Sequence, residues 1–399
     1  MFAKPPEARR ISTSGNSVGL NVVMVAGETS GDMLAATLMA GIAQRWPQVK
    51  LAGIGGPQMV ARGFDAWWPS EKLAVRGYVE VLRHYREIVG IRAALKARLL
   101  AQDPAQRPDL FIGVDAPDFN LDLERDLKAS GVKTIHFICP SIWAWRPERI
   151  KKIRQSVSHV LCIFPFEVEL LAQHGIEATY VGHPLAGLIP TEPDRAAARA
   201  ALGLAASDTV VAILPGSRRS EIKYLASRFF EAAGLVKRAQ PATKFIVPAI
   251  PALRGFITDA AQKAGVFPHV KILEGQSHTA LAACDVTLIA SGTATLEAAL
   301  FKRPMVIAYN MNWLSWQIMR RKKLQPWVGL PNILCRDFVV PEFLQDTATP
   351  LALAEAVLGW LNQPAKVAAL QEKFSSLHAL LKRDTTQLAT DAIQKVLQG

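Results

Sequence analysis

The sequence predicts a doubly wound α/β protein with parallel sheets. Short β-branched runs such as NVVMVA and TVVAIL alternate with amphipathic segments of helical length along the chain. This alternation is typical of βαβ units, in which parallel strands form one sheet with helices on both faces. The pattern pauses after residue 182 and restarts at residue 209, so we expect two similar halves with a ligand cleft between them, at the carboxyl ends of their strands.

The elements follow in order. In the first half we expect strands near 20–26, 49–54, 109–114, 132–138, 157–163 and 178–182, and helices at 31–45, 78–101, 118–130 and 166–174. A proline-containing connection follows, and then the strands TVVAIL, KFIVPAI, VKILEG, DVTLIA and PMVIAY with helices between them. The segment 350–399 reads as helical with a break at Pro364. The predicted division is a flexible extension 1–19, one Rossmann-like domain 20–185, a second 186–365, and helices 366–399 that pack on the first domain or on a partner subunit.

Composition limits the classes of partner. The 399 residues are half hydrophobic and carry a net charge of +12, which indicates a globular protein drawn to anions. No helix-turn-helix, RNA-binding or zinc-finger signature is present, so we expect no nucleic acid. The four cysteines lack metal-ligand spacing, and we expect reduced thiols and no metal. Neither a signal peptide nor a spanning apolar run is recognisable, so any membrane contact is expected to be peripheral.

Two strand-to-helix turns in the second half predict a nucleotide diphosphate site. One turn carries Gly216, Ser217 and Arg218; the other has Ser291, Gly292 and Thr293, with Glu297 one helical turn further on. Small residues at a helix N-terminus leave backbone N–H groups free for phosphate, and an arginine adds charge-assisted bonds. Glu297 is placed to accept hydrogen bonds from ribose hydroxyls. Ordinary capping would explain either turn alone, but two such turns in one domain favour nucleotide binding.

The strongest catalytic candidate is Asp115, in the segment FIGVDAPDFN. It follows a buried strand, and the carboxyl end of a parallel strand at the cleft is where a general base is expected. Asp118 begins the next helix, so helix capping is the alternative to a functional role. Two further features stay open: the tryptophans of PSIWAWR either stack on a ligand or pack internally, and His183 is either a ligand contact or a turn residue.

Two basic stretches with apolar residues at helical spacing, 72–100 and 313–330, predict either core-facing helices with solvated faces or surfaces that lie on anionic lipid. The second contains three tryptophans around Arg320–Lys323. The residues we expect at lipid are Val75, Val79, Leu82, Arg83, Arg86, Trp316, Arg320 and Lys322.

The segments VAGETSGD, FIGVDAPDFN, PSIWAWR, LPGSRRSEI, ASGTATLEAAL and LPNIL, in this order, resemble the lipid-A-disaccharide synthase family over residues 21–345. The resemblance implies a GT-B fold, with an acceptor domain first, a UDP-sugar domain second and C-terminal helices crossing back to the first domain. It implies UDP-2,3-diacylglucosamine as donor and 2,3-diacylglucosamine 1-phosphate as acceptor, joined with inversion to a β-1,6 disaccharide 1-phosphate and UDP. No cofactor or metal is implied.

The resemblance also suggests roles for further residues. Asn332, in LPNIL, is carried over as a donor-side contact, whereas Glu28, Ser30, Asp32 and Asp118 are expected on the acceptor side, with helix capping as the alternative for Ser30 and Asp32. The implied location is the cytoplasmic face of the inner membrane of a Gram-negative bacterium, and a homodimer stays open.

Three other functions compete with this reading. UDP-N-acetylglucosamine 2-epimerases and the lipid I transferase share the layout. In a different class, a non-catalytic basic protein that binds membrane or RNA would show no saturable UDP binding and would leave Asp115 and Glu297 without a role.

Overall fold

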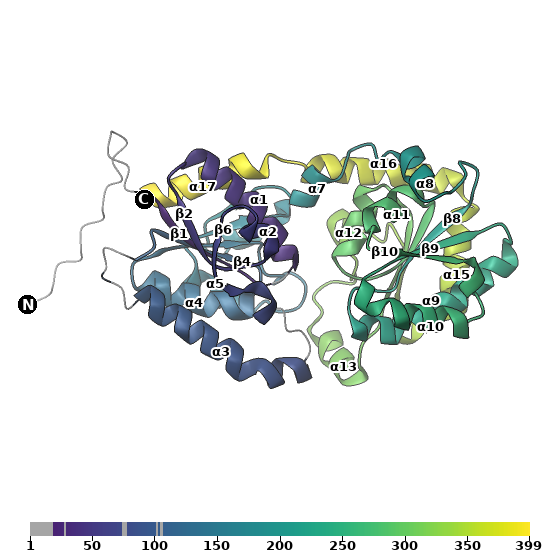
Figure 1. Ribbon diagram of the computed structural model, residues 1–399, viewed down its shortest axis with the longest axis horizontal. Coiled ribbons are helices and arrows are strands. Elements are labelled where there is room, and N and C mark those ends of the chain that lie inside the picture. The colour runs from purple at the N-terminus through teal and green to yellow at the C-terminus, as the bar shows by residue number, and fades with distance from the viewer. Residues whose placement is uncertain (1–18, 28, 74–77, 101–102, 104–106) are drawn as a thin grey trace, which may run out of the picture. The chain divides into compact units, whose positions relative to one another are not determined.

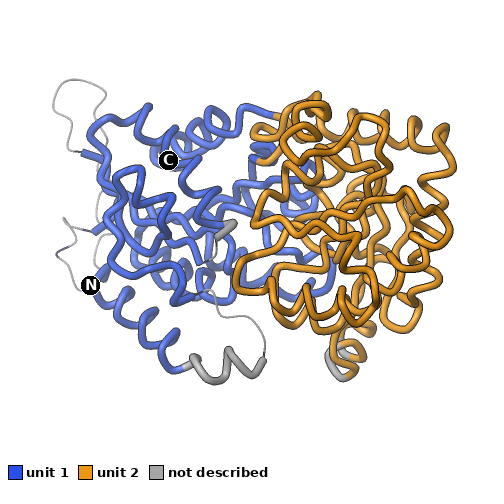
Figure 2. Tube along the Cα trace, turned by 45° about the vertical axis from the view of Figure 1, so that its right-hand side comes forward, with its two compact units in different colours: residues 1–184, 383–399 blue, residues 185–382 orange. Residues whose placement is uncertain are grey.

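The chain folds into two compact units. The computed structural model describes residues 19–27, 29–73, 78–100, 103 and 107–399. Unit 1 comprises Met1–Pro184 and Arg383–Gly399, and unit 2 comprises Leu185–Lys382 (Figure 2). Each unit is built around one parallel sheet, which confirms the predicted fold class.

The sheet of unit 1 has seven strands in the order β3-β2-β1-β4-β5-β6-β7, all paired in parallel. The strands are β1 (Asn21–Ala26), β2 (Lys50–Gly55), β3 (Asp65–Pro69), β4 (Leu110–Val114), β5 (Lys133–Phe137), β6 (His159–Cys162) and β7 (Ala178–Tyr180). The strand order reverses between β1 and β4. In open α/β sheets a crevice opens at this point, at the carboxyl ends of the two strands.

The helices of unit 1 include one from the C-terminus of the chain. They are α1 (Thr29–Arg45), α2 (Pro57–Val60), η1 (Ser70–Lys72), α3 (Tyr78–Leu100), α4 (Pro117–Ala129), α5 (Arg149–Ser156), α6 (Pro165–Ala172) and α17 (Thr385–Gln398). Helix α17 lies against α1 (Figure 1), where Gly41 makes room because a Cβ there would overlap Thr386 Cγ2. Arg45 pairs with Asp391 at 2.5 Å across the same contact. The expected return of a C-terminal helix to the first domain is confirmed.

The core of unit 1 explains why its central strands are continuous apolar runs. Residues 22–26 of β1 and all of β4 are buried, because helices cover both faces of the sheet. Ile91, Leu95 and Leu99 of α3 pack into this core with Val23 and Phe111. The described part of α3 therefore has the core-facing stripe that its helical spacing predicts.

Unit 2 repeats the arrangement with six parallel strands in the order β10-β9-β8-β11-β12-β13. These are β8 (Val210–Leu214), β9 (Lys244–Ala249), β10 (Val270–Glu274), β11 (Val286–Ala290), β12 (Met305–Tyr309) and β13 (Glu342–Leu344). Here the order reverses between β8 and β11. The two predicted diphosphate turns follow these two neighbouring strands, so the fold brings both to the carboxyl edge of the sheet at the point where the strand order reverses.

The helices of unit 2 are α7 (Pro184–Leu188), which begins at the boundary, α8 (Arg195–Ala201), α9 (Arg219–Ala239), η3 (Pro251–Leu253), α10 (Arg254–Lys263), η4 (Phe267–His269), α11 (Ser277–Ala283), α12 (Thr293–Leu300), α13 (Trp313–Lys322), α14 (Leu330–Cys335), η5 (Gln345–Thr347), α15 (Pro350–Leu361) and α16 (Pro364–Leu381). Helices α9 and α15 pack together over one face of the sheet, with Phe229, Phe230 and Val357 in the core beneath them. Of the predicted C-terminal helical segment, α16 belongs to unit 2 and α17 to unit 1.

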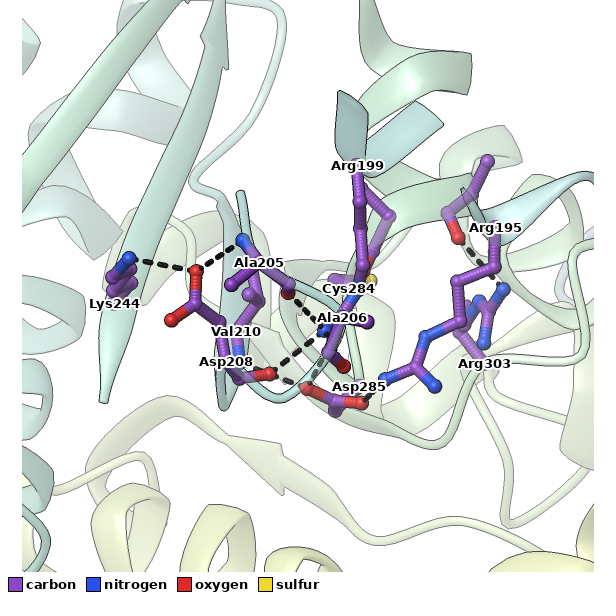
Figure 3. A network of polar contacts seen from close by, with 12 residues as sticks. Arg195, Arg199, Ala205, Ala206, Asp208, Val210, Lys244, Cys284, Asp285 and Arg303 are labelled. Carbon is purple, nitrogen blue, oxygen red and sulfur yellow. Dashed lines mark hydrogen bonds and ion pairs between the residues drawn. The ribbon is translucent and has the colours of Figure 1, made fainter. Parts of the chain in front are cut away.

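At the amino edge of this sheet, several charged residues form an internal network (Figure 3). Arg199, almost fully buried, donates to the carbonyls of Ala283 and Ala205 and to Asp285, which also accepts from the N–H of Val210 at 2.8 Å. Arg303 donates to the carbonyls of Leu281 and Ala282. These arginines hold strand and helix ends together, on the edge opposite the predicted site.

Candidate active site

The chain leaves β4 through a strained turn at Asp115. Asp115 and Ala116 have φ angles of +50° and +44°, in the left-handed region that non-glycine residues rarely adopt. Such strain persists only where the surrounding structure enforces it, and it clusters at functional sites. Asp115 is partly exposed at the end of a fully buried strand. The predicted general base therefore lies at the carboxyl edge, at the reversal point of the sheet.

Asn120 holds this turn from the interior. Its Nδ2 donates to the carbonyl oxygen of Asp115 at 2.8 Å, and its backbone N–H donates to the carbonyl of Ala116 at 3.0 Å. The N–H of Asp115 in turn donates to the carbonyl of Phe137 at 2.9 Å. Because Asn120 is fully buried, its amide is fixed, and it fixes the backbone that carries the Asp115 carboxylate.

A buried hydrogen bond between a carboxyl group and an imidazole, which the sequence did not indicate, lies behind the turn. Glu124 Oε1 is 2.7 Å from His136 Nδ1, and both side chains are completely buried. Burial raises the pKa of Glu124, and His136 offsets part of this rise. Gly113 leaves the space for this carboxylate, since a Cβ there would overlap Glu124 Oε1. Glu124 thus lies against β4 at Gly113, two residues before the strained turn begins at Asp115.

Asp32, which the sequence predicts on the acceptor side, makes internal hydrogen bonds. Its carboxylate is buried and accepts from the backbone N–H groups of Gly56 at 2.9 Å, Gln58 at 2.9 Å and Met59 at 3.1 Å. It therefore caps the turn that opens α2, rather than its own helix. Glu28 and the side chain of Ser30 lie outside the described residues.

Asp118 is highly exposed and meets two arginines. Arg149 contacts Asp118 Oδ1 directly, and Arg146 lies 3.6 Å from the same oxygen. The guanidinium of Arg146 also lies over the ring of Trp145, 3.9 Å from its centroid. Trp145 is 36% exposed, so the second tryptophan of PSIWAWR belongs to an accessible cationic surface.

The first tryptophan of PSIWAWR is structural. Trp143 packs edge-on against Phe164 and Phe166, and its indole N–H donates to Glu167 Oε1 at 3.1 Å. Glu167 is buried, and its Oε2 accepts from the N–H of Phe164. Burial raises the pKa of Glu167 to about 8. His183, whose ring is 5.7 Å from that of Phe164, is also buried, and burial lowers its pKa to about 4.

In unit 2, the turn after β8 gathers hydrogen-bond donors around one carboxylate. The N–H groups of Ser217 and Arg218 donate to Glu221 Oε2 at 2.9 and 3.3 Å, and the Arg218 guanidinium donates to Oε1 at 2.7 Å. Gly216 has a φ of +124°, and a Cβ there would overlap the side chain of Glu221. The turn thus gathers donors of the kind that bind anions, and Glu221, at the third position of α9, accepts from them in a capping box.

The second turn presents its helix N-terminus openly. Gly292 and Thr293 are exposed at the start of α12, while Ser291 Oγ donates to the carbonyl of Val328 at 3.0 Å. Glu297 is partly buried, and its Oε2 lies 3.5 Å from Nε2 of His278. This histidine, a neighbour that the sequence did not indicate, comes from α11.

Asn332 is fully buried and makes hydrogen bonds to other residues of unit 2. Its Nδ2 donates to the carbonyl of Val340 at 2.8 Å and to Glu342 Oε1 at 2.9 Å, and its Oδ1 accepts from the N–H of Val340. Glu342 in turn accepts from the N–H groups of Val328 and Gly329. Because Val328 also bonds Ser291, Asn332 supports the segment beside the second turn.

The predicted lipid surfaces are described in part. Val75 and the side chains of Val79, Leu82 and Arg83 lie outside the described residues, and Arg86 is exposed. On α13, Arg320 and Lys322 are exposed and Trp316 is half-buried. Three large apolar side chains of unit 2 are also well exposed: Trp313 (66%), Leu324 (53%) and Phe338 (58%).

Membrane-spanning helices and metal-ligand clusters are both absent from the described part of the chain. No helix there is long and apolar enough to cross a membrane. No group of three or more His, Cys, Asp or Glu side chains suited to a metal ion occurs in those same ranges.

The chain is similar to known proteins along nearly its whole length. The family model described as lipid-A-disaccharide synthetase matches residues 22–396. A lipid-A-disaccharide synthase from Albidiferax ferrireducens is 70% identical over 95% of this chain and 98% of the relative, and one from Verminephrobacter eiseniae is 63% identical over 95% and 97%.

Solved structures agree with the fold. The UDP-GlcNAc 2-epimerase from Neisseria meningitidis, bound to UDP-GlcNAc, aligns over 94% of this chain and all of the epimerase, with a TM-score of 0.64 and 12% identity. At this identity the likeness shows the fold alone, two parallel sheets of the GT-B kind, and the epimerase activity does not carry over. The match over residues 22–396 and the close relatives establish that the chain belongs to the lipid-A-disaccharide synthase family of glycosyltransferases.

Proposed function

We propose that this chain joins UDP-2,3-diacylglucosamine to 2,3-diacylglucosamine 1-phosphate. The products are the β-1,6-linked disaccharide 1-phosphate and UDP. The family match over residues 22–396 carries this proposal. The points where the strand order reverses in each sheet support it. In unit 1 this point carries Asp115 on a strained backbone, and in unit 2 it carries the turn whose Ser217 N–H donates to a carboxylate.

Asp115 is the general base of the proposed reaction. The acceptor's 6-hydroxyl is a weak nucleophile until its proton is removed, and the Asp115 carboxylate takes that proton as the oxygen attacks the anomeric carbon. The new O–C bond forms opposite the breaking bond to UDP, so the configuration inverts in one displacement. Asn120 is a positioning residue here, because it bonds the Asp115 carbonyl rather than the carboxylate.

The donor's diphosphate takes the place of Glu221. Its oxygens accept from the N–H groups of Ser217 and Arg218 and from the Arg218 guanidinium, the donors that bond Glu221 in the structure. These groups stabilise the charge that develops on the departing UDP. The exposed start of α12, at Gly292 and Thr293, adds further N–H groups, and Glu297 accepts from the ribose hydroxyls.

Asn332 and Asp32 act through backbone segments. Asn332 and Glu342 hold the 328–329 segment against Ser291, so we assign Asn332 to shaping the donor side. Asp32 holds the turn at Gly56 and shapes the acceptor domain in the same way.

Thermal-shift titration with UDP tests the donor site. A ligand that binds only the folded chain stabilises it by about 2.7 kcal/mol at a hundredfold excess over Kd, so UDP should raise the unfolding temperature of the wild type. Arg218→Met should lose most of this shift, whereas Arg238→Met, near the other end of α9, should keep it. Glu221→Gln should bind UDP more tightly, because the competing charge is gone. A wild type that UDP leaves unshifted contradicts the donor assignment.

We also propose that the chain attaches peripherally to the anionic cytoplasmic face of the inner membrane. The exposed Arg320 and Lys322 of α13, with the exposed Trp313, combine the charge and apolar surface that favour such binding.

Charge reversal tests this attachment. Each basic residue near an anionic surface contributes about 1 kcal/mol, so the double variant Arg320→Glu/Lys322→Glu should bind anionic vesicles at least about thirtyfold more weakly. The double variant Lys263→Glu/Lys366→Glu changes the net charge equally at exposed positions of the same unit and serves as the control. Equal losses in both variants would show that net charge, and not α13, governs the binding.

A further inference from the structure

We propose that Arg149 and Arg146 bind the 1-phosphate of the acceptor sugar. The inference rests on the proposed function and adds a recognition site to it. Both guanidinium groups converge on Asp118, in the first turn of α4 and three residues after the general base Asp115.

At Asp118, positive side-chain charge exceeds negative side-chain charge. Arg149 contacts Asp118 Oδ1, and Arg146 lies 3.6 Å from the same oxygen, so two cations share one carboxylate. That carboxylate belongs to a side chain that is 80% exposed. A guanidinium has five N–H donors, so the two guanidinium groups offer more donors than one carboxylate can accept. The local excess of positive charge therefore faces an accessible surface.

Further along α4, other basic residues share the carboxylates of Asp122 and Asp126. Arg92 and Lys152 pair with the two oxygens of Asp122 at 3.0 and 2.8 Å, and Lys96 pairs with Asp126 at 2.7 Å. These pairs lie further along the helix. Arg146 and Arg149 are set apart by their position, at the end of α4 nearest Asp115, and by the high exposure of the carboxylate that they share.

Both arginines are held in place before any ligand binds. The Arg146 guanidinium lies 3.9 Å from the centroid of the Trp145 ring, and that of Arg149 lies 5.9 Å from it. The side chain of Arg149 is only 14% exposed. An arginine that is already ordered loses less conformational entropy when it binds, and its planar fork suits a phosphate.

The chemistry of the acceptor makes a phosphomonoester the matching ligand. Its 1-phosphate and its 6-hydroxyl lie at opposite ends of one sugar. With the hydroxyl at Asp115, a phosphate dianion one ring away needs cations close to Asp115, and Arg146 and Arg149 are the cations held there. The site also distinguishes the acceptor from the donor, whose C1 carries a diphosphate bound in unit 2.

A comparison of two enzyme variants, each with two acceptors, tests the inference. Wild type and Arg149→Met are each assayed with the acceptor and with the same acylated sugar lacking the 1-phosphate. Charged hydrogen bonds of this kind correspond to about tenfold to hundredfold in kcat/KM. The wild type should lose that factor when the phosphate is removed. Arg149→Met should already have lost it with the phosphorylated acceptor and should lose little more without the phosphate.

Two controls separate recognition from folding. Arg154→Met, an exposed position on the same helix α5, should behave as wild type with both acceptors. Arg149→Lys should recover part of the preference for phosphate, because it restores a positive charge. UDP affinity should be equal in all variants.

Two results would overturn the inference: a wild type that turns over both acceptors equally, or an Arg149→Met loss that is the same with both acceptors. Failure of the proposed function looks different, since no disaccharide would then form from either acceptor even though the chain is folded.

Discussion

Asp115→Asn should reduce turnover by about 10²–10⁴-fold, the usual scale for loss of a general base. The amide has nearly the shape of the carboxylate but cannot accept the proton of the attacking hydroxyl. The strained backbone at residues 115 and 116 depends on Asn120 and Phe137, not on the carboxylate, and should persist. The measurement is kcat for disaccharide formation at saturating concentrations of both substrates.

This prediction has two controls, a second carboxylate on the helix that follows Asp115 and the binding of UDP to unit 2. Asp122→Asn removes a carboxylate on the outer face of α4, where Asp122 pairs with Arg92 and Lys152, and should leave kcat near the wild-type value. UDP affinity should be unchanged in Asp115→Asn, because the donor turns lie in unit 2. Near-normal turnover in Asp115→Asn would remove this residue from the mechanism.

The second large effect is a pH dependence of stability at Glu167. Burial raises its pKa from the ordinary 4.5 to about 8. Between these values the folded chain keeps the proton and the unfolded chain releases it. The contribution of Glu167 to the free energy of unfolding is therefore fully present below pH 4.5 and is lost as the pH rises through about 8. The loss over this window amounts to about 5 kcal/mol.

Comparison with Glu167→Gln isolates this contribution. Glutamine keeps an acceptor for the Trp143 indole but no longer accepts from the Phe164 N–H, a cost of about 1 kcal/mol that does not change with pH. The free energy of unfolding of Glu167→Gln, relative to that of the wild type, should thus increase as the pH rises from 4.5 to 8. His183, whose lowered pKa gives the opposite slope below pH 6.5, contributes equally to both proteins and cancels. A difference that is constant with pH would contradict a buried, protonated Glu167.

The fold was predictable because its signal is local and repeated. Alternating strands and helices with buried central strands predict parallel sheets, and both sheets have them. Two strands were missed, β3 (Asp65–Pro69) and β13 (Glu342–Leu344). Both are edge strands without a fully buried residue, so the apolar run that marks a central strand is absent.

The candidate site was predictable where the backbone dictates it and not where distant side chains meet. Asp115 and the turns at Gly216 and Gly292 follow strand ends, a position that the sequence pattern reveals. The partnership of Glu124 with His136 spans two elements and leaves no local pattern. Glu221 does have a signal, since an acid three residues into a helix suits a capping box, but that spacing does not reveal that it also accepts from the N–H of Ser217.

For polar residues beside the predicted site turns, the sequence does not distinguish a ligand contact from an internal support. Asp32 and Asn332 stand in such segments, yet both are buried and bond backbone groups far from their own turns. Likewise, part of the net charge of +12 belongs to arginines such as Arg199 and Arg303, which hold carbonyls inside unit 2. Composition counts these charges but does not distinguish them from exposed ones.

Direct detection of the products tests the central claim. The purified chain is incubated with UDP-2,3-diacylglucosamine and 2,3-diacylglucosamine 1-phosphate, and UDP and disaccharide are quantified together. We expect equal amounts of UDP and a β-1,6-linked disaccharide 1-phosphate. UDP release without disaccharide, or a disaccharide with the α configuration, would contradict the account.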